Sequence, residues 1–193
     1  MYKNTISLYT SKGQRKYLNQ NERQRFFNCT KDLRTDKRLF CQTLYFTGAR
    51  ISEVYNLMPL FIDYSNKTIV IETLKKRKKG IYREIPVPIS ILNDLQTFIQ
   101  DNSKNEDSRL WEFSLRTASR YVKEAMLKSH IVGKQASAKG LRHGFAVHAV
   151  SKVPITLVKK WLGHSRLDTT EIYLGVICLE ERVMAEKMWS TDY

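Results

Sequence analysis

The chain has 193 residues, 42% of them hydrophobic, which is enough for one globular domain with a buried core. Its formal net charge of +14 at pH 7 favours nucleic acid, or another anionic surface, as the partner. The sequence has no apolar run of about 18 residues, no secretory signal and no metal-ligand spacing among its three cysteines, so we expect a cytoplasmic protein without membrane association, metal or cofactor.

The N-terminal part of the chain predicts a short arm followed by helices. Residues 1–18 are basic and show little apolar periodicity, and we interpret them as a partly ordered arm. The alternative is a flexible terminus. Asn19 followed by Glu22 is a helix-start signal. Helical spacing of apolar residues then predicts three helices, over about 19–29, 35–47 and 50–58.

After Pro59 the apolar period changes from helical to alternating, which is typical of strands. The turns between the alternating segments, Ser65-Asn66 and Lys75–Gly80, are short enough for hairpins, so we expect the strands to pair antiparallel. The three strands are predicted over 61–64, 67–74 and 82–88.

From Ser90 onward the pattern is helical again. The predicted helices lie over about 91–100, 114–129, 139–151, 154–162 and 179–189, with a short one that begins at Asp168. We therefore expect a mainly helical α+β fold with one small three-stranded antiparallel sheet.

The segment Trp161–Tyr173 combines residues that could carry chemistry. His164 follows a glycine, and Tyr173 closes the segment. Asp168 and Glu171 have the spacing of a capping box, which predicts a helix that begins at Asp168 and carries Tyr173 about one turn in. A phenol held beside a histidine could attack a phosphate; a core histidine and a core tyrosine are the alternative interpretation.

Three other polar clusters each have a structural alternative. Arg50 stands at a predicted helix start, where it could simply pair with Glu53 on the same helix. The basic run 75–79 lies at a hairpin tip and could be a solvated turn. Arg142 and His143 lie near another helix start, where His143 could be a core or surface residue.

Taken together, the clusters fit the chemistry of a phosphodiester. Two arginines can bind its non-bridging oxygens with a planar fork that lysine lacks. A histidine or lysine donor can complete the site, and a lysine on a hairpin can protonate the leaving oxygen. Tyrosine can supply the nucleophile of a covalent phosphoester, although its free pKa of about 10 requires cationic neighbours and a base.

Four segments, in this order, resemble the sequence boxes of the tyrosine recombinase (phage integrase) family. Thr47–Glu53 is similar to the first arginine box, and Lys139–His143 is similar to the second, which usually reads His-x-x-Arg-His. Leu162–His164 and Thr169–Tyr173 are similar to the third box and to the nucleophile segment. With the hairpin lysines between the first two boxes, the resemblance covers about residues 19–190.

The resemblance implies a tyrosine recombinase catalytic-domain fold over residues 19–193 and a reaction without metal or ATP. Tyr173 would attack the scissile phosphate and leave a 3′-phosphotyrosine link and a free 5′-hydroxyl, which on a partner duplex would reverse the step and exchange strands. Arg50 and Arg142 would clamp the phosphate, and His164 would assist them.

The resemblance also implies supporting roles. His143 would hydrogen-bond the phosphate or accept a proton, and Glu53 would orient a neighbour. Lys75 is the first choice for the general acid, and Lys76 is the second, because Lys75 directly follows a predicted strand. The residues expected to contact the DNA backbone are Arg77, Lys78, Lys79 and Lys134.

Two features depart from the family pattern. Lys139 stands where the family most often has histidine; lysine still donates to phosphate, but it is a poor proton acceptor while charged. Only the arm, 1–18, precedes the predicted domain, whereas family members usually carry an N-terminal helical domain that closes around DNA. We therefore expect no such core-binding domain here, as in minimal recombinases that invert fimbrial promoters.

The expected partner is double-stranded DNA, bound by a homotetramer that forms on the DNA from free monomers, with accessory DNA-bending proteins as further candidates. In the family, exchanged C-terminal helices link the active sites of such a ring. Two other functions stay open from the sequence. One is a catalytically inactive DNA-binding regulator derived from an integrase, and the other is strand relaxation by a type IB topoisomerase.

Overall fold

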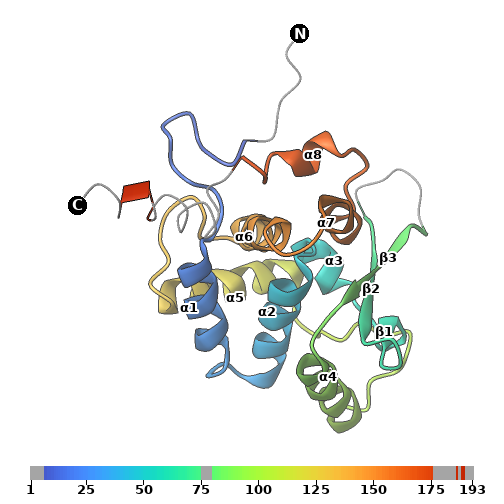
Figure 1. The fold of residues 1–193 in the computed structure, drawn as a ribbon. Coiled ribbons are helices and arrows are strands. Elements are labelled where there is room, and N and C mark those ends of the chain that lie inside the picture. The colour runs from blue at the N-terminus through green and yellow to red at the C-terminus, as the bar shows by residue number, and fades with distance from the viewer. Residues whose placement is uncertain (1–6, 75–79, 176–185, 187, 190–193) are drawn as a thin grey trace.

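The computed structural model describes residues 7–74, 80–175, 186 and 188–189 (Figure 1). The predicted hairpin tip at 75–79 and nearly all of the predicted C-terminal helix therefore lie outside the described residues. The helices are α1 (Gln20–Thr30), α2 (Thr35–Thr47), α3 (Ile51–Tyr55), α4 (Ile89–Asp101), α5 (Leu115–Lys128), α6 (Ala138–Val150), α7 (Ile155–Leu162) and α8 (Asp168–Glu171).

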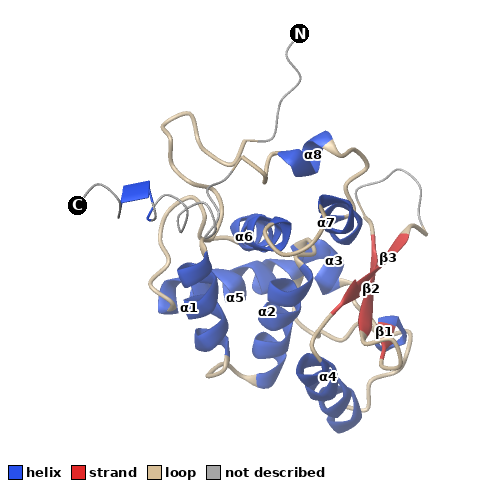
Figure 2. Ribbon diagram, in the orientation of Figure 1, coloured by secondary structure: helices blue, strands red, loops and turns tan. Residues whose placement is uncertain are grey.

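The strands are β1 (Ile62–Asp63), β2 (Thr68–Glu72) and β3 (Tyr82–Pro86), which form an antiparallel sheet in the order β1-β2-β3 at one edge of the helical body (Figure 2). The α+β prediction is confirmed. The strands are shorter than predicted, and the segment Pro59–Phe61 forms a 3₁₀ turn because proline fits the first turn of a helix. In the register of the sheet, Ile69 lies opposite Ile85 and Ile71 lies opposite Arg83.

The first two helices lie where the sequence predicted them, and capping residues define the start of α1 and the end of α2. The side chain of Asn19 accepts a hydrogen bond from the backbone N–H of Glu22, and the Glu22 carboxylate accepts one from the N–H of Asn19, so both ends of the capping box form. Helix α2 ends at Gly48, whose φ of 59° is left-handed. A Cβ on Gly48 would lie 2.3 Å from the Phe145 ring, so only glycine allows this approach of α2 to α6.

A helix begins at Asp168 as predicted, but the predictions of its cap and of the place of Tyr173 are wrong. Leu167 occupies the N-cap position of α8 without a side-chain cap, and the Asp168 carboxylate instead accepts a 2.6 Å bond from Arg166. The helix ends at Glu171, so Tyr173 lies in the turn after it rather than one turn inside it. The backbone N–H of Glu171 donates to the carbonyl of Leu167, so Asp168 is the first residue of the helix and not its cap.

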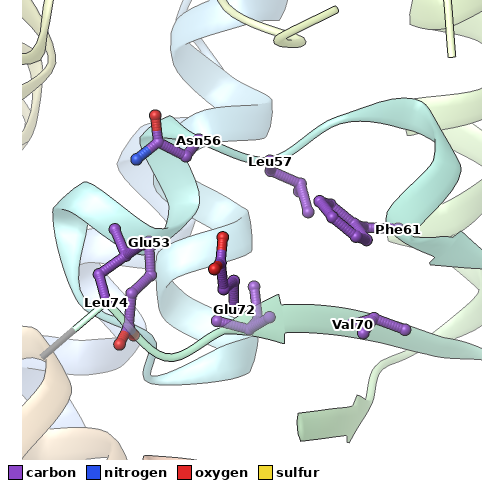
Figure 3. Close-up of a pocket in the computed structure, with 8 residues that line it drawn as sticks. Glu53, Asn56, Leu57, Phe61, Val70, Glu72 and Leu74 are labelled. Atoms are coloured by element: carbon purple, nitrogen blue, oxygen red, sulfur yellow. The ribbon is translucent and has the colours of Figure 1, made fainter. Parts of the chain in front are cut away.

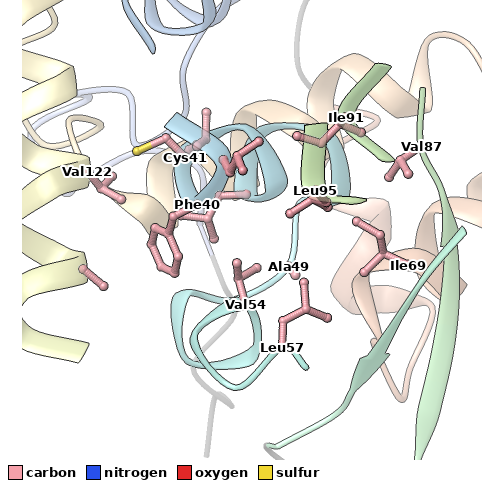
Figure 4. Close-up of a cluster of buried hydrophobic side chains, with 14 of the residues drawn as sticks. Phe40, Cys41, Ala49, Val54, Leu57, Ile69, Val87, Ile91, Leu95 and Val122 are labelled. Carbon is pink, nitrogen blue, oxygen red and sulfur yellow. The ribbon is translucent and has the colours of Figure 1, made fainter. Parts of the chain in front are cut away.

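Two clusters of buried side chains form the core. The larger one fills the space between the helices and the sheet, and it includes Phe40, Val54, Ile69 and Leu95 (Figure 4). The second cluster joins the two ends of the described chain around α6 and α7, and it consists of Leu8, Tyr17, Phe145, Ala146, Ala149, Val158, Leu162 and Tyr173. The expected arm therefore contributes buried residues next to the expected nucleophile.

Candidate active site

Arg50 and Glu53 form an ion pair at the start of α3. Glu53 Oε1 accepts a 2.7 Å bond from Arg50 Nη1, and Oε2 accepts one of 2.8 Å from the Arg50 backbone N–H. Glu53 is 3% exposed, and burial raises its pKa, but Arg83, the backbone N–H of Arg50 and the Arg50 charge together hold it below its usual range. A charged Glu53 therefore fixes the side chain of Arg50.

Arg83, on β3, lies behind this pair and was not predicted from the sequence as a site residue. Its Nη2 donates to Glu53 Oε2 at 2.6 Å, its Nη1 to Thr73 Oγ1 at 2.9 Å, and its Nε to the carbonyl of Trp161 at 2.7 Å. A signal existed in the strand pattern, because alternation along β3 places this arginine on the same buried face as Ile85. An arginine on an apolar strand face requires buried partners.

Arg142, on α6, is held by backbone carbonyls. Its Nη1 donates to the carbonyl of Gly48 at 2.9 Å, and its Nη2 donates to that of Leu162 at 2.7 Å. These bonds join the ends of α2 and α7 to the second box. Burial, and then the charge of Arg50, lower the pKa of Arg142 to about 10, so the guanidinium stays charged at neutral pH.

His164 follows Gly163, whose φ of 64° ends α7 in a left-handed turn. Its Nε2 lies 3.3 Å from Arg142 Nη2, and its Nδ1 lies 2.9 Å from Thr170 Oγ1. Because arginine only donates, Nε2 must accept, and the proton of a neutral ring is then on Nδ1. Burial and the charges of Arg142 and Arg50 lower the pKa of His164 to about 3, which agrees with a neutral ring.

Tyr173 is 1% exposed, and its phenol oxygen lies 2.9 Å from Nδ1 of His143. Its ring lies nearly parallel to that of His164, with an interplanar angle of 13°. Burial raises the pKa of Tyr173 to about 12, although Arg142 and Arg50 act in the opposite direction. The phenol is therefore protonated at neutral pH, and a DNA backbone cannot reach it in this arrangement.

His143, on α6, is 5% exposed and neutral. Burial, followed by the charges of Lys139 and Arg142, lowers its pKa to about 4. A neutral ring can accept the phenol proton on Nδ1, with its own proton on Nε2. Within the described part of the chain, Nε2 has no hydrogen-bond partner.

The structure thus brings together six of the residues expected from the sequence: Arg50, Glu53, Arg142, His143, His164 and Tyr173. Lys139 lies on the first turn of α6 with an exposed side chain, and Lys134 is exposed in the preceding loop. The expected general acids, Lys75 and Lys76, and the expected DNA contacts Arg77, Lys78 and Lys79 lie outside the described residues.

A pocket of about 350 Å³ opens beside His164, between the base of the β2–β3 hairpin and α7. Lys159 and Lys160 line it from α7, and Thr73 and Arg83 line it from the sheet side. The two lysines therefore give this pocket cations that suit a phosphate oxygen. In residues 7–74 and 80–175, no group of three or more His, Cys, Asp or Glu side chains could hold a metal ion.

Comparison with known proteins decides the family. The model of the phage integrase family matches residues 16–177, which include every box described above. The chain belongs to the phage integrase family. The expected resemblance is confirmed, and so is the catalytic-domain fold. As far as the chain is described, none of its helices is long and apolar enough to cross a membrane.

The relatives that this chain matches within the phage integrase family are named tyrosine recombinases. It is 29% identical over 181 residues to tyrosine recombinase XerA of Thermococcus kodakarensis, covering 89% of this chain and 62% of the relative. It is 32% identical over 148 residues to a tyrosine recombinase of Pseudothermotoga lettingae, covering 74% of this chain and 50% of the relative. The chain thus spans between half and two thirds of the length of these relatives.

Solved structures share the fold of this family member. A crystal structure of XerA recombinase has a TM-score of 0.73 at 23% identity and covers 89% of this chain and 64% of its own. XerH site-specific recombinase, bound to palindromic difH substrate in a post-cleavage complex, has a TM-score of 0.76 at 22% identity and covers 97% of this chain and 57% of its own. At these identities the likeness concerns the fold.

Proposed function

We propose that this protein is a site-specific DNA recombinase that cleaves and rejoins DNA strands through a covalent link to Tyr173. The observation that carries the proposal is the 2.9 Å contact between the phenol oxygen of Tyr173 and His143, beside two arginines and His164. A nucleophile within hydrogen-bond reach of a neutral base, next to cations, is the arrangement that phosphoryl transfer by a phenol requires.

The proposed reaction begins when DNA binding opens the buried cluster and brings the scissile phosphate to Tyr173, which keeps its contact with His143. The phenol oxygen forms a bond to phosphorus, its proton passes to Nδ1 of His143, and the bond from phosphorus to the 5′ oxygen breaks. Lys75, or Lys76, donates a proton to that oxygen. Attack by a 5′-hydroxyl of a partner duplex reverses these steps, so the energy of the broken bond is conserved in the phosphotyrosine.

Arg50 and Arg142 are proposed to bind the non-bridging oxygens, each with a guanidinium fork. Their positions support this role, because Glu53 holds the first and two backbone carbonyls hold the second. His164 would assist them from the third box by accepting from Arg142 Nη2 and so orienting that guanidinium. Lys139 is placed on the exposed first turn of α6, where it suits a contact with a phosphate better than proton transfer.

Double-stranded DNA is the proposed substrate, with Arg77, Lys78, Lys79 and Lys134 on its backbone. The net charge of +14 supports this choice, as do relatives named tyrosine recombinases. Assembly of four copies on DNA from free monomers, helped by accessory DNA-bending proteins, completes the proposal. We also propose a cytoplasmic location, because the free thiols of Cys29 and Cys41 suit a reducing compartment.

Covalent trapping tests the proposal and does not require a defined DNA site. A library of duplexes with randomised arms carries a nick just 3′ of each candidate phosphate, so that cleavage releases a short fragment and traps the adduct. We expect an SDS-resistant protein–DNA adduct whose peptide contains Tyr173. The sequence of the trapped DNA then supplies a substrate for later experiments. Adduct attached at another residue would contradict the mechanism.

The same assay separates the alternatives. A protein that binds DNA but forms no adduct on any library member would be a DNA-binding regulator. A plasmid with two copies of the recovered site distinguishes the other case. Deletion or inversion between the sites supports a recombinase, whereas relaxation without either product supports a topoisomerase.

A further inference from the structure

Arg83 is a buried arginine without a part in the reaction proposed above. It is 6% exposed, and three of its nitrogen atoms donate to groups on α3, on α7 and just after β2. Its partners are 30, 10 and 78 residues away along the chain. A charge in such a place is costly to bury unless each contact is well formed, so the arrangement depends on all three.

Each partner of Arg83 adjoins a residue of the candidate active site. Glu53 accepts from Arg83 on Oε2 and from the Arg50 guanidinium on Oε1. Thr73 follows β2 at the base of the hairpin, and its N–H donates to the carbonyl of Ile81 at 2.8 Å, which closes that base. Glu53, from α3, and Glu72 and Leu74, at the end of β2, line one small pocket, so α3 lies close to this hairpin base (Figure 3).

The third partner is the carbonyl of Trp161, in the last turn of α7, ahead of His164. The turn here is packed closely against the arginine. A Cβ on Gly163 would lie 3.2 Å from both Arg83 Nη1 and Thr73 Oγ1. The guanidinium therefore fixes the distance between the sheet and the turn that carries the third box.

We propose that Arg83 is a positioning residue for the phosphodiester cleavage proposed above, which holds Arg50, the base of the β2–β3 hairpin and the His164 turn in one arrangement. It acts through Glu53, Thr73 and the Trp161 carbonyl and does not touch the DNA. Because the planar fork donates in three directions at once, the single ammonium of lysine cannot replace it. The inference rests on the proposed recombinase function.

The test compares Arg83→Lys with Arg38→Lys on the trapped DNA sequence. Arg38 also makes a 2.6 Å ion pair, with Asp94, but it joins α2 to α4 outside the candidate active site. We expect Arg83→Lys to lower the single-turnover cleavage rate at saturating DNA about a hundredfold, since small displacements of catalytic groups have effects of that size. Its DNA affinity should match that of the wild type, and Arg38→Lys should cleave normally.

Several results would overturn the proposal. One is an Arg83→Lys protein that cleaves as fast as Arg38→Lys, and another is a defect that saturating DNA removes. If Arg83→Lys fails to fold, Thr73→Val decides, because it removes one acceptor of Arg83 and keeps the side-chain shape. We expect about a tenfold slower cleavage from the loss of that contact, and a wild-type rate would exclude the link to the hairpin.

Wild-type protein run in parallel separates this inference from the function on which it rests. If the wild type forms no adduct, the recombinase function and the role of Arg83 both fail. If the wild type forms its adduct and Arg83→Lys forms it equally fast, only the positioning role fails.

Discussion

The phenol oxygen of Tyr173 and Nδ1 of His143 lie 2.9 Å apart, and neither side chain is more than 5% exposed. The nucleophile and its proposed base are therefore paired before any DNA is present. Burial raises the pKa of the phenol and lowers that of the imidazole, so both partners are neutral and the proton stays on oxygen. Negative phosphate charge next to the pair would favour the imidazolium and hence the transfer.

We expect Tyr173→Phe to form no covalent adduct while it binds DNA as tightly as the wild type. The substitution removes only the attacking oxygen and leaves the basic surface unchanged. Loss of the hydrogen bond to His143 should lower the free energy of unfolding by about 1 kcal/mol. Gel analysis under denaturing conditions measures the adduct, and a gel-shift assay measures binding.

Tyr121→Phe is the matched control for that variant, because Tyr121 is also buried, at 9% exposure, but lies on α5 in another part of the core. It should form the adduct at the wild-type rate. An adduct formed by Tyr173→Phe would assign the nucleophile to another tyrosine.

We expect His143→Ala to slow cleavage by about 10²- to 10⁴-fold, the range measured for loss of a general base. DNA affinity should change little, because the side chain is buried. Single-turnover adduct formation at saturating DNA measures the effect. The control is His148→Ala, on the same helix but exposed. Equal rates for the two variants would move the base role away from His143.

We expect a substrate with a 5′-bridging sulfur to rescue Lys75→Ala. Sulfur leaves as a thiolate without protonation, so the variant should cleave it at nearly the wild-type rate while it cleaves the normal phosphodiester slowly. Lys78→Ala is the control, because a backbone contact affects both substrates equally. Rescue of Lys76→Ala instead would assign the general acid to the neighbouring residue.

We expect DNA binding to weaken steeply with salt, because a chain of net charge +14 should neutralise several phosphates. For Z phosphates, the logarithm of the affinity should fall with that of the salt concentration with a slope of about −0.9Z. Replacing Lys78 and Lys79 by alanine should flatten the slope by about 1.8 if both contact phosphates. Fluorescence anisotropy over a salt series measures it, and a flat wild-type slope would contradict DNA as the partner.

Local patterns predicted most of the fold. The capping box at Asn19 and Glu22, the stop at Gly48 and the change to alternation after Pro59 depend on neighbours within a few residues, and each formed as expected. The box at Asp168 and Glu171 was just as local, but Leu167, and not Asp168, occupies the N-cap position of α8. Spacing alone does not decide which of two neighbouring residues becomes the N-cap.

The contacts inside the site could not be predicted in the same way. The sequence left open whether His143 is a core residue, and it is buried against a tyrosine 30 positions away. Arg83 was missed because its partners meet only when α3, the sheet and α7 pack together. Tyr173 is buried in one cluster with Leu8 and Tyr17, which come from a segment with little apolar periodicity.

The two site histidines should make folding stability depend on pH. The ordinary pKa of histidine is 6.5. In the folded chain, burial is the main reason that the pKa is about 4 for His143 and about 3 for His164. Below pH 6.5 the unfolded chain therefore binds protons that the folded chain does not bind. The contribution of the two histidines to the free energy of unfolding is fully present above that pH. It is lost as the pH falls, by up to about 1.4 kcal/mol per pH unit for each histidine.

Urea unfolding at pH 7, 6 and 5 tests this expectation in a window where carboxylates remain mostly ionised. We expect His143→Asn to be less stable than the wild type at pH 7 but to lose less stability by pH 5, since one of the two titrating groups is gone. The control is His130→Asn, because His130 is exposed with a φ of 53° that asparagine tolerates. It should keep the full pH dependence. A wild-type protein equally stable at pH 7 and pH 5 would show that these histidines gain their protons in the folded state.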